Sequence, residues 1–309
     1  MKKIIITFCI VFIFNTSSFA DKRFDVDLKK ISKLNSFTNN KGEPYQLDNN
    51  IDKDKTIILI YNHGSWGDEK GLNGCNKKWS KIPPAIYQLD GSKIMDFTIK
   101  TYQLCSGVRG WTKKEEDLFW DVYDKNKQDV NSVLKLKDKK GELLANKWKS
   151  PKRQKVVKFK IDEFKNKGFK NIVLSGHSAG GWDSLLLKSN FPSEVDGVIA
   201  FNPARSGKFA KNKKPHRGWV NWRKYKVSLI KVDKLEKVLV YSHEKDAYEN
   251  TKTLSFLSSS NTVEFIDLTN TKCKKKTILG GWHGITLTKC FADQDPKSKK
   301  IIKYLEEVY

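Results

Sequence analysis

The sequence predicts an α/β protein with a mostly parallel central sheet, flanked by helices, in one domain. Short runs of strand-forming residues recur along the chain, and segments of helix length separate most of them. The 309 residues are 38% hydrophobic, with nine Trp, 17 Phe and ten Tyr, enough for a sizeable core. That aromatic content excludes a disordered polybasic chain. A mean hydropathy of −0.59 excludes a polytopic membrane protein.

Residues 1–20 have the features of a secretory signal peptide. Two lysines follow the initiator methionine, an apolar run spans 4–14, and the small residues Ser18 and Ala20 mark a cleavage site after Ala20. The run is shorter than the roughly 20 apolar residues of a transmembrane helix. An uncleaved N-terminal anchor is the alternative. The protein is therefore predicted to be periplasmic or secreted, with 21–309 as a single mature domain.

Export would place the remaining cysteines in an oxidising compartment. Cleavage removes one of the five and leaves Cys75, Cys105, Cys273 and Cys290. Four cysteines allow three pairings. We predict Cys75–Cys105 and Cys273–Cys290, because each pair brackets one loop region. No C-x-x-C or compact Cys/His cluster is present in the sequence, so no metal site is predicted.

Strands and helices are predicted from residue 56 onward. The run TIILIY is β-branched, as expected of a strand buried on both faces. The predicted strands are Thr56–Tyr61, Phe97–Leu104, Asn171–Ser175, Val195–Phe201, Lys237–Tyr241 and Val263–Leu268. The predicted helices include Lys152–Lys167, Ala179–Ser189, Tyr248–Leu257 and Pro296–Glu307.

One predicted strand runs directly into a motif that carries chemistry. The segment Gly176-His177-Ser178-Ala179-Gly180 matches G-x-S-x-G, with a strand before it and a helix after it. The turn is so tight that side chains at its flanks would clash, which requires small residues there. It exposes the Ser178 hydroxyl above the sheet and aims the amides of the next helix at it. A glycine-rich turn without chemistry is the alternative.

A serine hydroxyl is a weak nucleophile, so it needs a nearby base that is oriented by an acid. His283 lies in a loop after the last predicted strand, and Asp246 lies in the loop after Lys237–Tyr241. We predict Ser178 as nucleophile, Asp246 as acid and His283 as base. Glu244 is the alternative acid, and another histidine is the alternative base.

The reaction also needs backbone donors for the oxyanion that forms on the substrate. One is expected from Ala179, the residue after the nucleophile. The second is expected from the loop that follows the first predicted strand, at Ser65, with Trp66 as the alternative. In that loop Gly64 lets the backbone turn its amide towards the site, and His63 is predicted to be structural.

With its HG loop, its GHSAGG turn, its strand-end aspartate and its late WHG histidine, the chain resembles the α/β-hydrolase superfamily. The resemblance covers roughly residues 56–309. Within the superfamily it is most similar to the dienelactone-hydrolase-like and prolyl-oligopeptidase-like branches, which share the NHG-type oxyanion loop. Dienelactone hydrolases have a cysteine nucleophile where this chain has Ser178, and this difference favours ordinary ester or amide hydrolysis.

The resemblance implies acyl transfer without a metal or an organic cofactor. His283 would deprotonate Ser178, an acyl-enzyme would form, and water would release the acid. The substrate is expected to be a small-molecule carboxylic ester. A serine peptidase or amidase of the same fold, and a non-catalytic protein that binds anionic surfaces, are the alternatives.

The formal charge of +24 comes from 59 Lys and Arg against 35 Asp and Glu, and only six of the basic residues are Arg. Sequence-specific nucleic-acid readers favour Arg, and no nucleic-acid-binding module is recognisable, so no specific nucleic acid is predicted as a partner. The segment Ala204–Leu235 holds eleven Lys or Arg, one acid, and interleaved Trp and Tyr. It is predicted to be a short cap that attracts anionic substrates or anionic envelope surfaces; a solvated lysine-rich segment is the alternative.

Overall fold

The computed structural model describes residues 35–65, 80–208, 217–219, 221–274, 278, 280–294 and 299–309. The predicted signal peptide at 1–20 lies outside these ranges. Trp66 and Cys75 lie outside them as well. Within them, no helix combines the length and the apolar character needed to span a membrane.

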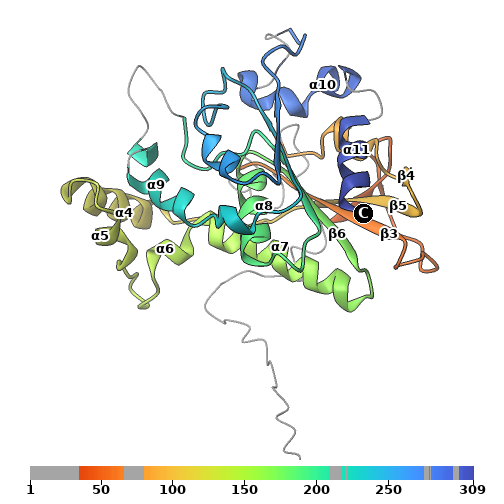
Figure 1. Ribbon diagram of the computed structural model, residues 1–309. Coiled ribbons are helices and arrows are strands. Elements are labelled where there is room, and N and C mark those ends of the chain that lie inside the picture. Colours follow the sequence, from red (N-terminus) through yellow and green to blue (C-terminus); the bar gives the residue numbers. More distant parts are fainter. Residues whose placement is uncertain are drawn as a thin grey trace, which may run out of the picture.

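A sheet of nine strands forms the centre of the described part of the molecule (Figure 1). The strand order is β2-β1-β5-β3-β6-β7-β8-β9, and β4 pairs with β5 beside this path. Six neighbouring strands are mutually parallel: β5 (Phe97–Leu104), β3 (Thr56–Asn62), β6 (Asn171–His177), β7 (Gly197–Phe201), β8 (Val238–Ser242) and β9 (Val263–Asp267). The antiparallel strands are β1 (Ser36–Thr38), β2 (Pro44–Tyr45) and β4 (Lys93–Ile94). The predicted, mostly parallel sheet is thus confirmed.

Apolar side chains bury both faces of this sheet. In β3, Ile58 and Ile60 belong to one buried cluster, and Ile57, Leu59 and Tyr61 belong to the other. Successive strand residues point to opposite faces, so a run without polar positions needs cover on both sides.

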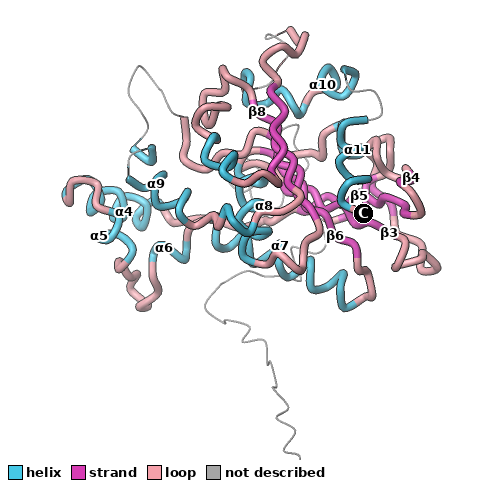
Figure 2. The backbone as a smooth tube through the Cα atoms, in the orientation of Figure 1, coloured by secondary structure: helices cyan, strands magenta, loops and turns pink. Residues whose placement is uncertain are grey.

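Helices supply that cover, and Figure 2 shows them on either side of the strands. The helices α7 (Lys149–Asn166) and α8 (Ala179–Asn190) pack on the cluster that contains Ile58. The helices α3 (Pro84–Tyr87), α10 (Lys289–Gln294) and α11 (Lys299–Val308) pack on the cluster that contains Ile57. The helix predicted at Ala179–Ser189 is thus present as α8, directly after β6.

Four further helices form a separate apolar cluster at the left of Figure 1: α4 (Lys113–Lys125), α5 (Val130–Leu134), α6 (Leu144–Lys147) and α9 (Asn221–Ser228). We call it the side cluster; its buried members are Phe119, Trp120, Tyr123, Val133, Leu144 and Trp222. Of these four helices, only α9 lies in the predicted cap segment Ala204–Leu235. The other three come from 113–147, which the sequence did not mark as an insertion.

The predicted helix at Tyr248–Leu257 is wrong. The segment forms turns and then a short 3₁₀ helix, η4 (Ser255–Ser259). The side chains of Asn250 and Thr253 each accept a hydrogen bond from the other's backbone amide, at 2.8 Å in both cases. Such local side-chain bonds compete with helical hydrogen bonds.

The predicted disulfide between Cys273 and Cys290 is present, with 5.9 Å between their Cα atoms. It ties the loop after β9 to α10. Cys105 is buried and also disulfide-bonded. The partner predicted for it, Cys75, lies outside the described residues.

Candidate active site

The turn between β6 and α8 holds Ser178 in a backbone conformation that other residues rarely adopt. Its φ is 55° and its ψ is −120°, a strained region that costs about 1–3 kcal/mol and is found mostly at functional sites. Gly176 and Gly180, on either side of the turn, have no Cβ, and this lets neighbouring backbone segments pack directly against them. A Cβ on Gly180 would lie 2.1 Å from the carbonyl oxygen of Asn62, and one on Gly176 would lie 2.4 Å from the carbonyl carbon of Gly180. The G-x-S-x-G pattern is therefore a packing requirement of this turn.

The fold brings together the three residues that the sequence nominated. The Oγ of Ser178 lies 2.8 Å from Nε2 of His283, and Nδ1 of His283 lies 2.7 Å from Oδ2 of Asp246. Asp246 follows β8, and His283 lies in the 3₁₀ segment η6 (Gly281–Leu287). The carboxylate accepts the Nδ1 proton, which leaves Nε2 free to accept the serine proton. This is the arrangement that activates a serine for nucleophilic attack.

Asp246 is held by two donors besides His283. Nδ2 of Asn202 donates to Oδ2 at 3.1 Å, and the amide of Tyr248 donates to Oδ1 at 2.8 Å. Asn202 follows β7 with a φ of 44° and is fully buried, and its own Oδ1 accepts from Thr286 at 3.3 Å. Sequence reasoning missed Asn202; the only signal was a polar residue at the end of a buried strand.

We expect Asp246→Asn to lower kcat for any reaction in which Ser178 is the nucleophile by about 10³–10⁴-fold, because a neutral side chain whose NH2 group can donate to Nδ1 favours the wrong tautomer and no longer stabilises the imidazolium. Glu244→Gln is the matched control. The side chain of Glu244 is 53% exposed and pairs with Lys245 at 3.5 Å, so its loss should change kcat by less than about twofold. Steady-state kinetics on both variants measures this, and a larger loss from Glu244→Gln would overturn the assignment of the acid.

His177 lies beside His283 and is hydrogen-bonded to its backbone. Its Nε2 lies 2.7 Å from the carbonyl oxygen of His283, and the two rings are 4.9 Å apart. Burial, aided by the nearby His283, lowers the pKa of His177 to about 3. The ring is therefore neutral at ordinary pH, and its Nε2–H donates to that carbonyl. His177 thus anchors the backbone of the histidine segment.

The lowered pKa of His177 predicts an acid-dependent loss of stability. Between about pH 6.5 and pH 3 the unfolded chain binds this proton and the folded chain does not, so the free energy of unfolding falls as pH decreases. The slope from this one group approaches about 1.4 kcal/mol per pH unit. Urea unfolding of wild type and His177→Gln between pH 7 and pH 4 should show a shallower slope in the variant. Equal slopes would contradict this.

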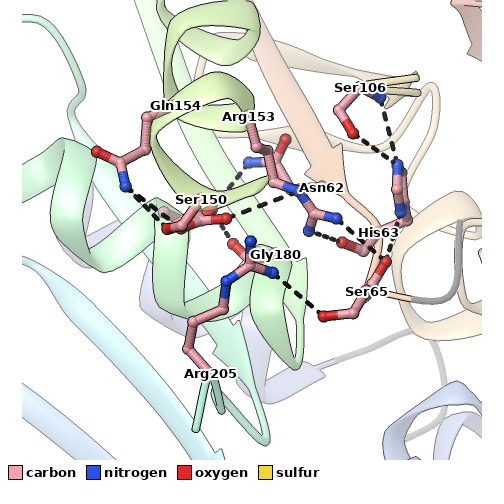
Figure 3. Close-up of polar contacts among 12 residues, drawn as sticks. Asn62, His63, Ser65, Ser106, Ser150, Arg153, Gln154, Gly180 and Arg205 are labelled. Carbon is pink, nitrogen blue, oxygen red and sulfur yellow. Dashed lines mark hydrogen bonds and ion pairs between the residues drawn. The ribbon is translucent and has the colours of Figure 1, made fainter. Parts of the chain in front are cut away.

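The loop after β3 is held by a buried arginine, Arg153 of α7 (Figure 3). Its Nη1 donates to the carbonyl oxygen of His63, and its Nη2 donates to that of Gly64 at 3.3 Å. Nδ1 of His63 also bonds the Gly64 carbonyl, at 2.6 Å, and Nε2 accepts from the Ser106 amide at 3.3 Å. His63 thus contacts its own loop. Arg153 was not recognised in the sequence.

These contacts orient the amide expected to bind the oxyanion. The carbonyl of Gly64 and the amide of Ser65 belong to one planar peptide and point in opposite directions. Because that carbonyl faces Arg153, the Ser65 amide faces away from it. The loop also passes close to Ser178, since a Cβ on Gly64 would lie 3.4 Å from the Cβ of Ser178. Ala179, the other expected donor, begins α8, and first-turn amides have no helical acceptor.

A cavity of about 410 Å³ opens at this point. Its lining includes Ser178, His283 and Ser65, with Arg205 and Tyr248 on other walls. Four residues of the predicted cap segment thus line the cavity over Ser178: Ala204, Arg205, Gly207 and Lys208. In the described ranges no group of three or more His, Cys, Asp or Glu is placed to hold a metal ion.

The sheet order, the strained turn after β6 and the placement of Asp246 and His283 after later strands are those of the α/β-hydrolase fold. The predicted fold is therefore confirmed. No protein-family model and no curated protein sequence matches the chain.

Among solved structures, one reported for the metagenome-derived lipolytic enzymes LipS and LipT is similar at 11% identity and a TM-score of 0.45, covering 87% of this chain and 96% of that one. Est1E from Butyrivibrio proteoclasticus has 11% identity and a TM-score of 0.45, over 88% and 93%. A putative dipeptidyl aminopeptidase IV from Bacteroides ovatus has 15% identity and a TM-score of 0.48, over 84% of this chain and 32% of that one.

Proposed function

We propose that the protein is a serine hydrolase that cleaves carboxylic esters through an acyl-enzyme. The observation that carries the proposal is the hydrogen-bonded chain from Asp246 through His283 to Ser178, with distances of 2.7 and 2.8 Å. Two further observations favour a catalytic role of these side chains over a purely structural one. Ser178 has a strained φ, and a cavity lies over its hydroxyl.

In the proposed reaction, Nε2 of His283 takes the proton of Ser178 as Oγ attacks the ester carbonyl carbon. The negative charge that forms on the carbonyl oxygen is stabilised by the amides of Ala179 and Ser65. His283 then gives the proton to the leaving alcohol, and the acyl group stays on Ser178. Water, deprotonated by the same histidine, attacks this ester, and His283 returns the proton to Oγ of Ser178 as the carboxylic acid is released.

We also propose that the protein acts outside the cytoplasm. A signal peptide at 1–20 would export it, and the disulfides at Cys273–Cys290 and at Cys105 agree with an oxidising compartment. Electrostatic association with anionic envelope surfaces stays a prediction from the charge of +24.

A fluorophosphonate probe tests the proposed chemistry directly, because it labels activated serines. Wild type should be labelled and Ser178→Ala should not, and wild type should turn over p-nitrophenyl esters of graded chain length faster than peptide amides. An unlabelled wild type, or a labelled Ser178→Ala, would overturn the proposal. Faster cleavage of amides would reassign the protein as a peptidase or amidase.

A further inference from the structure

A second and larger cavity, of about 680 Å³, adjoins the one over Ser178. The two share Ser65, Arg205 and Gly207 in their linings, so they meet at these residues. The second cavity extends from there to the side cluster. A substrate that extends from Ser178 past these shared residues would enter the second cavity.

Tryptophans and cations line this second cavity. Its aromatic wall includes Trp120 and Trp222, which are buried members of the side cluster, and Trp111 and Trp148, which pack against that cluster. Its basic lining residues are Arg109, Lys149, Arg205 and Lys226, and a single acid, Glu116, lines it with them. Such a lining favours an anion that carries or adjoins an apolar group.

Arg205 stands at the junction of the two cavities and is 8% exposed. Its Nη1 donates to Oγ of Ser65 at 3.1 Å, and its guanidinium lies 5.1 Å from the ring centroid of Trp148. The preceding amide, that of Ala204, donates to the carbonyl oxygen of Ser178 at 3.1 Å. The backbone that carries Arg205 is thus tied to the backbone of the nucleophile (Figure 3 shows the side chain reaching Ser65).

A buried lysine, Lys226, lies beside Arg205. Nζ of Lys226 donates to the carbonyl oxygen of Arg205 at 2.6 Å and lies 4.2 Å from the Trp148 ring centroid. Burial first, and then the nearby Arg205, lower the pKa of Lys226 well below its usual value. A guanidinium stays protonated in proteins and offers a planar pair of donors that matches a carboxylate.

We propose that this second cavity binds the carboxylate of an ester substrate that carries a further acidic group, and that Arg205 determines this specificity. The inference rests on the proposed function and names its substrate class. The ester carbonyl lies over Ser178, and the distal carboxylate lies against Arg205 beside the face of Trp148. An uncharged ester lacks this contact.

Two esters test the specificity: the mono-p-nitrophenyl ester of adipic acid and p-nitrophenyl hexanoate. Their acyl chains have equal numbers of carbons, and only the first ends in a carboxylate. Wild type should prefer the adipate ester by about tenfold or more in kcat/KM at low salt, and added NaCl should reduce the preference. Arg205→Gln should lower the adipate-to-hexanoate ratio by about 10–100-fold, and Arg205→Lys should restore part of it.

Lys224→Gln is the matched control. It removes one positive charge from α9 at an exposed position outside the cavity lining, so the ratio should stay at the wild-type value. Equal kcat/KM for the two esters in wild type would overturn the inference. So would equal losses on both esters in Arg205→Gln, because Arg205 would then act only through Ser65.

Binding separates this inference from the proposed function. Calorimetry of the adipate monoester with Ser178→Ala, and with Ser178→Ala/Arg205→Gln, needs no turnover. Tighter binding by the first protein supports the anion site even if wild type hydrolyses nothing, in which case only the proposed function fails. Equal binding by the two proteins would overturn the anion site even if wild type is an active esterase.

Discussion

Replacing Ser178 or His283 by alanine should lower kcat for p-nitrophenyl butyrate by about 10⁴–10⁶-fold, and replacing both should cost little more than either change alone. The two side chains act as one unit, because Oγ can attack only as Nε2 takes its proton over 2.8 Å. Once either is lost, the other contributes almost nothing, so the effects on the activation free energy do not add.

Ser258→Ala is the control for the serine change, since Ser258 is exposed and its variant should keep wild-type kcat. Thermal unfolding of all variants shows whether the losses come from chemistry rather than misfolding. Ser178→Ala with more than about a hundredth of wild-type kcat would mean a different nucleophile. Additive losses in the double variant would mean that Ser178 and His283 act separately.

Gly180→Ala should reduce the free energy of unfolding by roughly 3 kcal/mol or more. Its Cβ would lie 2.1 Å from the carbonyl oxygen of Asn62 and 2.6 Å from that of His63. Both contacts are to backbone, which cannot rotate away as a side chain can. The change also forces the oxyanion loop away from Ser178, so activity should fall with stability. Urea denaturation measures the first effect.

The sign of this effect is informative. Ala is favoured over Gly in a helix interior by about 1 kcal/mol, and Gly180 lies in α8, so helix propensity alone predicts stabilisation. Gly141→Ala is the matched control: Gly141 has φ of 81° and open space around it, so only the left-handed backbone should cost energy, about 1–2 kcal/mol. A Gly180→Ala protein as stable as wild type would contradict the close approach of α8 and β3.

Part of the site could be predicted because its signals are local. The G-x-S-x-G turn is a short contiguous pattern, and the buried strands before it are readable from β-branched runs. Asp246 and His283 follow because strand ends of a parallel sheet meet at one edge. The helix predicted at Tyr248–Leu257 failed for an equally local reason, the reciprocal bonds of Asn250 and Thr253.

The α/β class and the candidate residues Ser178, Asp246 and His283 could be predicted from the order of the residues, since periodicity and turn chemistry act between neighbours in the chain. The supports of the site depend on distant segments and needed the folded molecule. Asn202 reaches Asp246 across 44 residues, and Arg153 reaches the His63 carbonyl across 90. The sequence gives a net charge of +24, but it does not show which of the basic side chains lie near the candidate site. Tertiary packing set Arg205 between Ser65 and a tryptophan wall, because only contact in space decides which of 59 basic residues lines a given cavity.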